Sequence, residues 1–196
     1  MATFTPYLQQ TLAGRMFTSH GSVGGTAITI PIYSTTSPTF ALWNPLGTGR
    51  VIVPVSLQVG VAATATPAIG SLALSQVLNT GGAFATGLPI AAWTDGIVYN
   101  GRSKYGSSNS AGANNGGRIG IATTTLTTAG NTFYELGVSQ ATTTLASGLV
   151  WLEHDFNDKL ALDPGTLVHL VGNPAAPVET MNVTMSWYEI DLAVAG

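Results

Sequence analysis

The alternation of apolar and polar residues is clearest from Arg50 to Val61, where the chain reads RVIVPVSLQVGV. Every odd position from Val51 onwards carries an apolar side chain, whereas the even positions are mixed. Because successive side chains of a strand point to opposite faces, this pattern predicts a long strand with one apolar face against the core. Pro54 has no N–H to donate to a neighbouring strand, so we expect an edge position or a β-bulge there.

The residues just before this strand predict a hairpin. Phe40 to Trp43 has the composition of a short strand, and Asn44 to Gly49 is dense in turn-forming residues. The order of short strand, tight turn and long strand is typical of two adjacent antiparallel strands.

The last strand is predicted from Thr180 to Leu192. Its apolar residues occupy odd positions as far as Trp187 and even positions from Tyr188 onwards. A change of phase within one strand is typical of a β-bulge or of a passage between two sheets.

The remaining chain predicts further short strands separated by Gly and Pro turns, and it shows no convincing amphipathic helix. Roughly nine or ten strands of this kind indicate an all-β protein, and we expect a jelly-roll-like antiparallel β-sandwich. Residues 1–13 predict an N-terminal arm or a short helical turn, and residues 14–196 form the single sandwich domain. Asn100 to Gly117, which reads NGRSKYGSSNSAGANNGG, predicts a long polar surface loop at about 100–117.

Charged residues make up only 8% of the 196 residues, against about 25% in an ordinary soluble protein. Such a chain can keep its surface in water through Thr, Ser, Asn, Gln and Gly, or bury it in a permanent assembly, and we expect both. The net charge of -3 and the absence of a basic cluster argue against nucleic-acid binding. No apolar run approaches the roughly 18 residues of a membrane helix, and the N-terminus does not read as a secretory leader. The absence of Cys excludes disulfides and thiolate metal sites.

Three stretches resemble a widespread class of tailed-bacteriophage virion proteins: TFALWNPLGTGRVIVPVSLQVGV, LALDPGTLVHLVG and VETMNVTMSWYEIDL. That class pairs a W-N-P-x-G-(S/T)-G-(R/K) turn in the first third of the chain with an L-x-P-G turn and a C-terminal strand ending in aromatic and acidic residues. The similarity covers about residues 14–61 and 149–192. The resemblance implies a jelly-roll-like structural protein of a virion that decorates or cements the head.

The densest charged cluster is Glu153-His154-Asp155, with Asp158 nearby. On a strand, the two outer carboxylates would share a face and could bind a hard cation, but His154 would point away. We therefore favour a solvated loop over a metal site.

No other pattern predicts catalysis or a cofactor. His20, His154 and His169 are too far apart in sequence for a recognisable metal motif, and we expect His169 to be a half-buried histidine with its hydrogen bonds satisfied. The chain has no G-x-S-x-G elbow and no phosphate-binding glycine pattern followed by Lys-Ser/Thr. We expect the protein not to be an enzyme and to need no cofactor or metal.

Binding residues are expected where loops interrupt the strands, because loops on a rigid β scaffold often carry contacts. A tolerated, solvated loop is the alternative at 100–117. Trp93 could be an exposed ring that stacks on a sugar, although a core position is favoured. The candidate interface residues are Trp93, Arg102, Lys104, Tyr105 and Arg118.

The sequence leaves three functions open, of which the first is favoured. It is a capsid decoration or cement protein of the virion that forms a homo-oligomer, with a trimer as first choice, and binds the major capsid protein without chemistry. The second is a head-fibre or tail-associated module that recognises a host glycan through the polar loop and Trp93. The third is a jelly-roll capsid protein that forms the shell itself.

Overall fold

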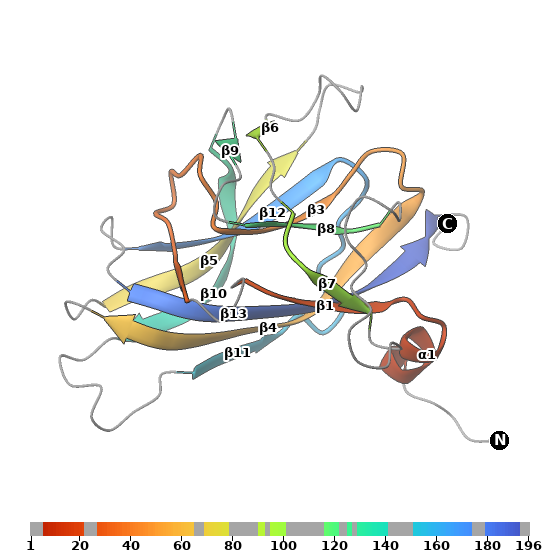
Figure 1. Ribbon diagram of the computed structural model, residues 1–196, viewed down its shortest axis with the longest axis horizontal. Helices are drawn as coiled ribbons and strands as arrows, with labels where there is room; N and C mark the ends of the chain where they lie inside the picture. The colour runs from red at the N-terminus through yellow and green to blue at the C-terminus, as the bar shows by residue number, and fades with distance from the viewer. Residues whose placement is uncertain are drawn as a thin grey trace.

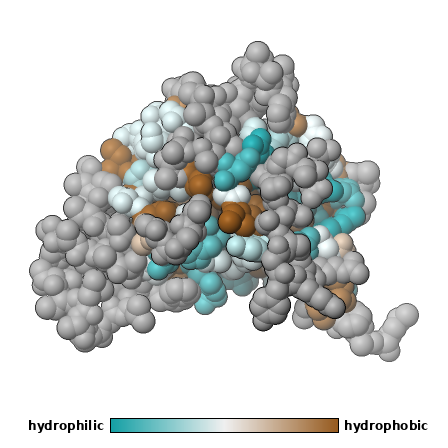
Figure 2. Space-filling view, in the orientation of Figure 1, coloured by the Kyte–Doolittle hydropathy of each residue, from teal (hydrophilic) through white to brown (hydrophobic). Residues whose placement is uncertain are grey.

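The computed structural model describes residues 6–21, 27–64, 69–78, 90–92, 95–100, 116–121, 125–126, 129–140, 151–173 and 179–192. Figure 1 shows a short helix at one end of two layers of strands. On the face seen in this orientation, hydrophilic and hydrophobic residues are interspersed (Figure 2). The elements are α1 (Pro6–Leu12), β1 (Met16–His20), β2 (Ile28–Thr29), β3 (Phe40–Asn44), β4 (Arg50–Thr64), β5 (Ile69–Leu78), β6 (Ile90–Ala92), β7 (Val98–Asn100), β8 (Arg118–Ile121), β9 (Thr125–Leu126), β10 (Asn131–Gln140), β11 (Trp151–Asp155), β12 (Thr166–Asn173) and β13 (Glu179–Asp191).

The strands form two antiparallel sheets that face each other. Sheet A has the order β11-β4-β13-β1-β7, with β2 also paired to β13, and sheet B has the order β10-β5-β12-β3-β8. The main hydrophobic core is built from the facing sides of both sheets, and its largest fully buried side chains include Trp187, Phe40 and Phe156. The predicted all-β sandwich is confirmed.

Eight of these strands pair in a nested order. The first pairs with the last (β1 with β13), and the second with the second to last (β3 with β12). The third and fourth strands follow the same rule, because β4 pairs with β11 and β5 with β10. Of the other described strands, β7 and β8 lie at sheet edges, and β6 and β9 form a separate pair. The short β2 pairs with β13.

The predicted hairpin between Phe40 and Val61 is wrong, although both of its strands exist. β3 belongs to sheet B and β4 to sheet A, so the turn between them crosses from one layer to the other. Both edges of each strand are already occupied, β3 by β12 and β8 and β4 by β11 and β13. A tight turn between two apolar strands is compatible with either arrangement, and here the partners from later in the chain determine which one forms.

The apolar stripe of β4 changes face half-way along the strand. Leu57 and Val59 lie in the main core, but Val51, Val53 and Val55 form a separate cluster on the outer face of sheet A. The change comes from a β-bulge, since β13 pairs with positions 56 and 54 of β4 and passes over Val55. The bulge expected at Pro54 is therefore confirmed, whereas the single uninterrupted core face is wrong.

The last strand, β13, keeps its alternation throughout. Its odd positions face the core as far as the buried Glu189, and its even positions face outwards. The apparent change of phase arises because the outward Tyr188 is also covered, by Val53 and by Tyr7 of α1. The predicted bulge does occur at this level of the sheet, but the extra residue is in β4.

Helix α1 occupies the predicted N-terminal arm and lies on its own chain. It ends in a Schellman cap, in which Gly14 N–H bonds to Thr11 C=O at 3.0 Å and Arg15 N–H to Gln10 C=O at 2.9 Å. Gly14 has a φ of 73°, the left-handed conformation that this cap requires. The helix thus turns directly into β1 and covers the apolar end of the outer face of sheet A.

Candidate functional site

The three stretches that carry the resemblance meet in space at one end of the sandwich. Asn44 is fully buried, and its Nδ2 donates to the carbonyl oxygens of Arg50 and Leu162, both at 2.8 Å. Its Oδ1 accepts from the hydroxyl of Thr48 at 2.8 Å, and its carbonyl accepts from Gly165 N–H at 2.7 Å. One side chain therefore replaces the hydrogen bonds that a hairpin would have made, and it joins the first turn to the L-x-P-G turn.

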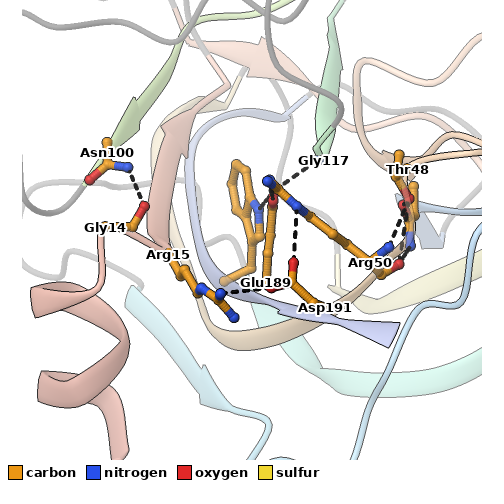
Figure 3. A network of polar contacts seen from close by, with 10 residues as sticks. Gly14, Arg15, Thr48, Arg50, Asn100, Gly117, Glu189 and Asp191 are labelled. Atoms are coloured by element: carbon orange, nitrogen blue, oxygen red, sulfur yellow. Dashed lines mark hydrogen bonds and ion pairs between the residues drawn. The ribbon is translucent and has the colours of Figure 1, made fainter. Parts of the chain in front are cut away.

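Next to this turn, the carboxylate of Glu189 is the centre of a network that we call the polar junction (Figure 3). Glu189 is 3% exposed, and its Oε2 accepts from Arg50 NH1 at 2.7 Å. Its Oε1 accepts from the backbone N–H of Gly117 at 2.8 Å and lies 3.4 Å from Trp187 Nε1. Both oxygens are thus engaged by donors from three separate parts of the chain.

A second carboxylate extends the polar junction towards solvent. Asp191 accepts from Arg15 NH2 at 2.7 Å and lies 3.6 Å from Arg50 Nε. Its side chain is 41% exposed, as is that of Arg15, so water screens this pair far more than it screens Glu189. The two arginines hold the end of β13 against the starts of β1 and β4.

Two glycines make room for the buried carboxylate. A Cβ on Gly116 would lie 2.7 Å from both oxygens of Glu189. A Cβ on Gly117 would lie 2.7 Å from Ile52 Cδ1 and 3.0 Å from Trp187 Nε1. The backbone can approach Glu189 closely enough to donate its N–H only because neither position has a side chain.

The polar junction also fixes both ends of the predicted polar loop. Asn100 is the first residue of that segment, and its Nδ2 donates to Gly14 C=O at 2.6 Å. Gly117 is the last residue and is held by Glu189. The two attachments belong to one network, because the neighbouring Arg15 bonds to Asp191 and its carbonyl accepts from Glu189 N–H at 3.0 Å.

This arrangement is suited to holding segments together. The buried carboxylate is neutralised by Arg50, and no serine, histidine or threonine nucleophile is among its hydrogen-bond partners. Within the described ranges, no group of three or more His, Asp or Glu residues is placed to bind a metal ion. The geometry therefore points to mechanical support of the loop and strand ends.

Among the predicted interface residues, Arg118 is the one that the structure describes. Its guanidinium makes a two-point contact with Asp95, through Nε to Oδ1 at 3.0 Å and NH2 to Oδ2 at 2.7 Å. It also lies 5.2 Å from the ring centroid of Trp43. These contacts join β8 to Asp95, three residues before the start of β7, so part of its role is internal. Trp93, Arg102, Lys104 and Tyr105 lie outside the described residues.

The acidic cluster on β11 has the geometry expected of a strand. Glu153 lies beside Gln58, whose Nε2 donates to it at 3.1 Å. His154 points the other way and contacts Tyr134, with Nε2 3.2 Å from the hydroxyl. Burial lowers the pKa of His154, partly offset by Asp155. The favoured solvated loop is therefore wrong for Glu153, His154 and Asp155, which lie on β11 paired to β4, whereas Asp158 lies in an exposed turn beyond the strand.

The expectation for His169 is wrong in two respects. The side chain is 1% exposed and not half-buried, and neither ring nitrogen has a hydrogen-bond partner. The pattern of Leu167 to Val171 showed an apolar strand but could not show that both of its faces are covered.

Sequence reasoning also missed the polar junction. The sequence pattern places Glu189 opposite the apolar side of the last strand and Gly116 and Gly117 in the predicted polar loop. One signal in the sequence could have indicated this network. Glu189 continues the odd, inward-facing positions of β13, and Arg50 offers a positive charge at the start of β4.

Comparison with models of known protein families, with curated proteins and with solved structures gives no match to this chain. Within the part of the chain that the structure describes, no helix has the length and apolar character needed to cross a membrane.

Proposed function

We propose that this protein is a structural component of a virion, a decoration or cement protein that binds a phage capsid as a homo-oligomer and performs no reaction. Its support comes from the sequence resemblance, from the arrangement of the strands and from one surface of sheet A. That surface is the observation that carries the proposal.

The surface, which we call the hydroxyl face, is the outer side of sheet A beyond the part that α1 covers. The register places Thr18, Ser186 and Ser56 in one row, and His20, Thr184 and Gln58 in the next. These side chains are partly exposed and include no Asp, Glu, Lys or Arg, and the described acidic residues of this face stand at its β11 edge.

Three neighbouring strands, β1, β13 and β4, that present Ser, Thr and Gln side chains are suited to contact with another protein. The cores of protein interfaces are depleted in charged residues, because each charge must be desolvated when the surfaces meet. A stable interface buries on the order of 1,600 Å² in total, or about 800 Å² on each partner. Several such contacts per subunit would resist detachment without any chemistry.

We also infer that the sandwich is a jelly roll. A jelly roll consists of eight antiparallel strands in two sheets. The nested pairing of first with last and second with second to last is what results when a long antiparallel ribbon is rolled into two layers. This inference supports the virion proposal only as an analogy of fold.

The homo-oligomer can be tested by placing a charge in the hydroxyl face. Light scattering on the purified protein should give a multiple of the subunit mass, with three subunits as first choice. Thr184→Lys should weaken the assembly at least about tenfold, because each copy would bury an unpaired ammonium group. Thr132→Lys, an exposed position on β10, is the matched control and should leave the mass unchanged. A wild type that is monomeric at every concentration, or a Thr184→Lys variant that assembles normally, would overturn this part of the proposal.

A further inference from the structure

The imidazole of His169 is buried on the outer side of sheet B together with a buried hydroxyl. His169 on β12 lies directly opposite Ser75 on β5, and the two side chains are 1% and 0% exposed. Neither ring nitrogen has a hydrogen-bond partner, and neither does Ser75 Oγ. Buried polar atoms without hydrogen-bond partners are rare and unfavourable. A movement that admits water to this pair therefore costs less free energy than one that exposes buried polar atoms already hydrogen-bonded to the protein.

The backbone of Gly130 covers this pair. A Cβ on Gly130 would lie 2.6 Å from Ser75 Oγ and 3.0 Å from His169 Nε2, so only a glycine fits at this distance. Gly130 itself is partly exposed, and its neighbours Ala129 and Asn131 are exposed. On this side, the short segment from Ala129 to Asn131 therefore separates the imidazole from solvent.

The described residues that face His169 carry no charge to compensate a proton. Ala41 lies opposite on β3, Ser75 on β5, and Gly130 above. The ionisable groups further along the same face, on the elements beside it, are the exposed Glu135 on β10, Tyr33 near Ser71, and the Arg118–Asp95 pair beside β8. Burial lowers the pKa of His169 to about 4, with the backbone of Leu170 acting in the opposite direction.

We propose that the segment Ala129–Asn131 is an acid-released cover, which opens when His169 takes up a proton while the two sheets remain folded. The proton binds at Nε2, the nitrogen beneath Gly130, and the resulting imidazolium reaches water by displacement of this segment alone. A buried imidazole beneath a thick layer of side chains would need global unfolding instead.

The size of the effect follows from the two protonation equilibria. In the open form, His169 titrates near its ordinary pKa of 6.5, and in the closed form near 4. Linkage between proton binding and opening then raises the ratio of open to closed protein about 60-fold between pH 7 and pH 4.5.

Hydrogen exchange on the full-length protein tests this directly. The amides from residue 129 to residue 134, corrected for intrinsic pH effects, should open about 60-fold more often at pH 4.5 than at pH 7. Amides of β13 should show no such change. His169→Leu should abolish the pH response, whereas His154→Gln, which removes another histidine of lowered pKa, should preserve it.

Gly130→Ala is the second variant, because its methyl group should push the segment away from Ser75 and raise exchange already at pH 7. The proposal is overturned if the segment is unprotected at pH 7, or if it opens only together with β13. It is equally overturned if the response persists in a folded His169→Leu variant. Should that variant not fold, His169→Gln replaces it, with the same result required.

Discussion

The polar junction predicts a large difference between two carboxylates of the same strand. Glu189 is 3% exposed and Asp191 is 41% exposed, yet both contact the guanidinium of Arg50. Glu189→Gln preserves the size of the side chain and one acceptor, but it removes the charge and places an amide N–H₂ group among three donors. Hydrogen bonds to a charged group contribute about 1.5–3 kcal/mol each, and breaking a fully buried ion pair costs about 3–5 kcal/mol.

The full cost of a buried pair does not apply here, because Arg50 is 36% exposed and retains Asp191 at 3.6 Å. We therefore expect Glu189→Gln to lower the free energy of unfolding by about 2–3 kcal/mol. Asp191→Asn removes an exposed pair and should cost no more than about 1 kcal/mol.

Urea unfolding at one fixed protein concentration measures both values, and the slope m should stay unchanged. Arg50→Gln serves as a further variant, since it leaves the buried carboxylate without its cation and should cost at least as much as Glu189→Gln. Equal costs for Glu189→Gln and Asp191→Asn, within about 0.5 kcal/mol, would refute the claim that burial makes Glu189 the centre of the junction.

Three further substitutions test neighbouring parts of the structure. Gly117→Ala should lower the free energy of unfolding by about 1–3 kcal/mol in the same urea assay, because its methyl group would overlap Ile52. Asn44→Ala should cost at least about 2 kcal/mol, since it removes three side-chain hydrogen bonds at the turn between the sheets, to Arg50, Leu162 and Thr48. Burial, together with the hydrogen bond to Asp158, raises the pKa of Tyr188 to about 12 from 10.0. Folding thus favours the protonated phenol of Tyr188. Its contribution to the free energy of unfolding is complete below pH 10 and falls as the pH rises towards 12. Tyr188→Phe should remove that alkaline loss in a pH series of melting temperatures, whereas an unchanged profile would contradict the assignment.

The strands of this protein could be predicted from sequence, but their partners could not. The alternation in β4 and β13 shows where a strand runs, because the period of two is a local property of the backbone. Which strands become neighbours depends on contacts between distant parts of the chain, and the hairpin expected at Asn44–Gly49 proved to be a crossing between sheets.

Burial on both sides of a strand was the second obstacle. Tyr188 suggested a change of phase, but it is apolar and outward because α1 covers it, while Glu189 is polar and inward because Arg50 neutralises it. The expectation of a half-buried His169 is wrong for the same reason. A pattern of hydrophobic residues indicates which positions of a strand are buried, but it does not indicate which element of the structure covers them.

The candidate site was only partly accessible from sequence. The resemblance selected the turn at Asn44, the turn at Pro164 and the end of β13, and these segments do meet. Chemistry alone would not have joined them, because the partners of Asn44 and of Glu189 include backbone groups, the Leu162 carbonyl and the Gly117 N–H, which the sequence does not distinguish. The proposed contact residues in the loop at 100–117 remain predictions.

Binding to a phage capsid that has been stripped of this protein tests the central claim most directly. Purified protein should bind at a fixed copy number per capsomer and raise the temperature at which the capsid breaks open. Thr184→Lys, which disrupts the hydroxyl face, should bind at least about tenfold more weakly than Thr132→Lys. Absence of binding to the capsid, together with strong binding to glycans on an array, would contradict the proposed structural role and favour a host-recognition module.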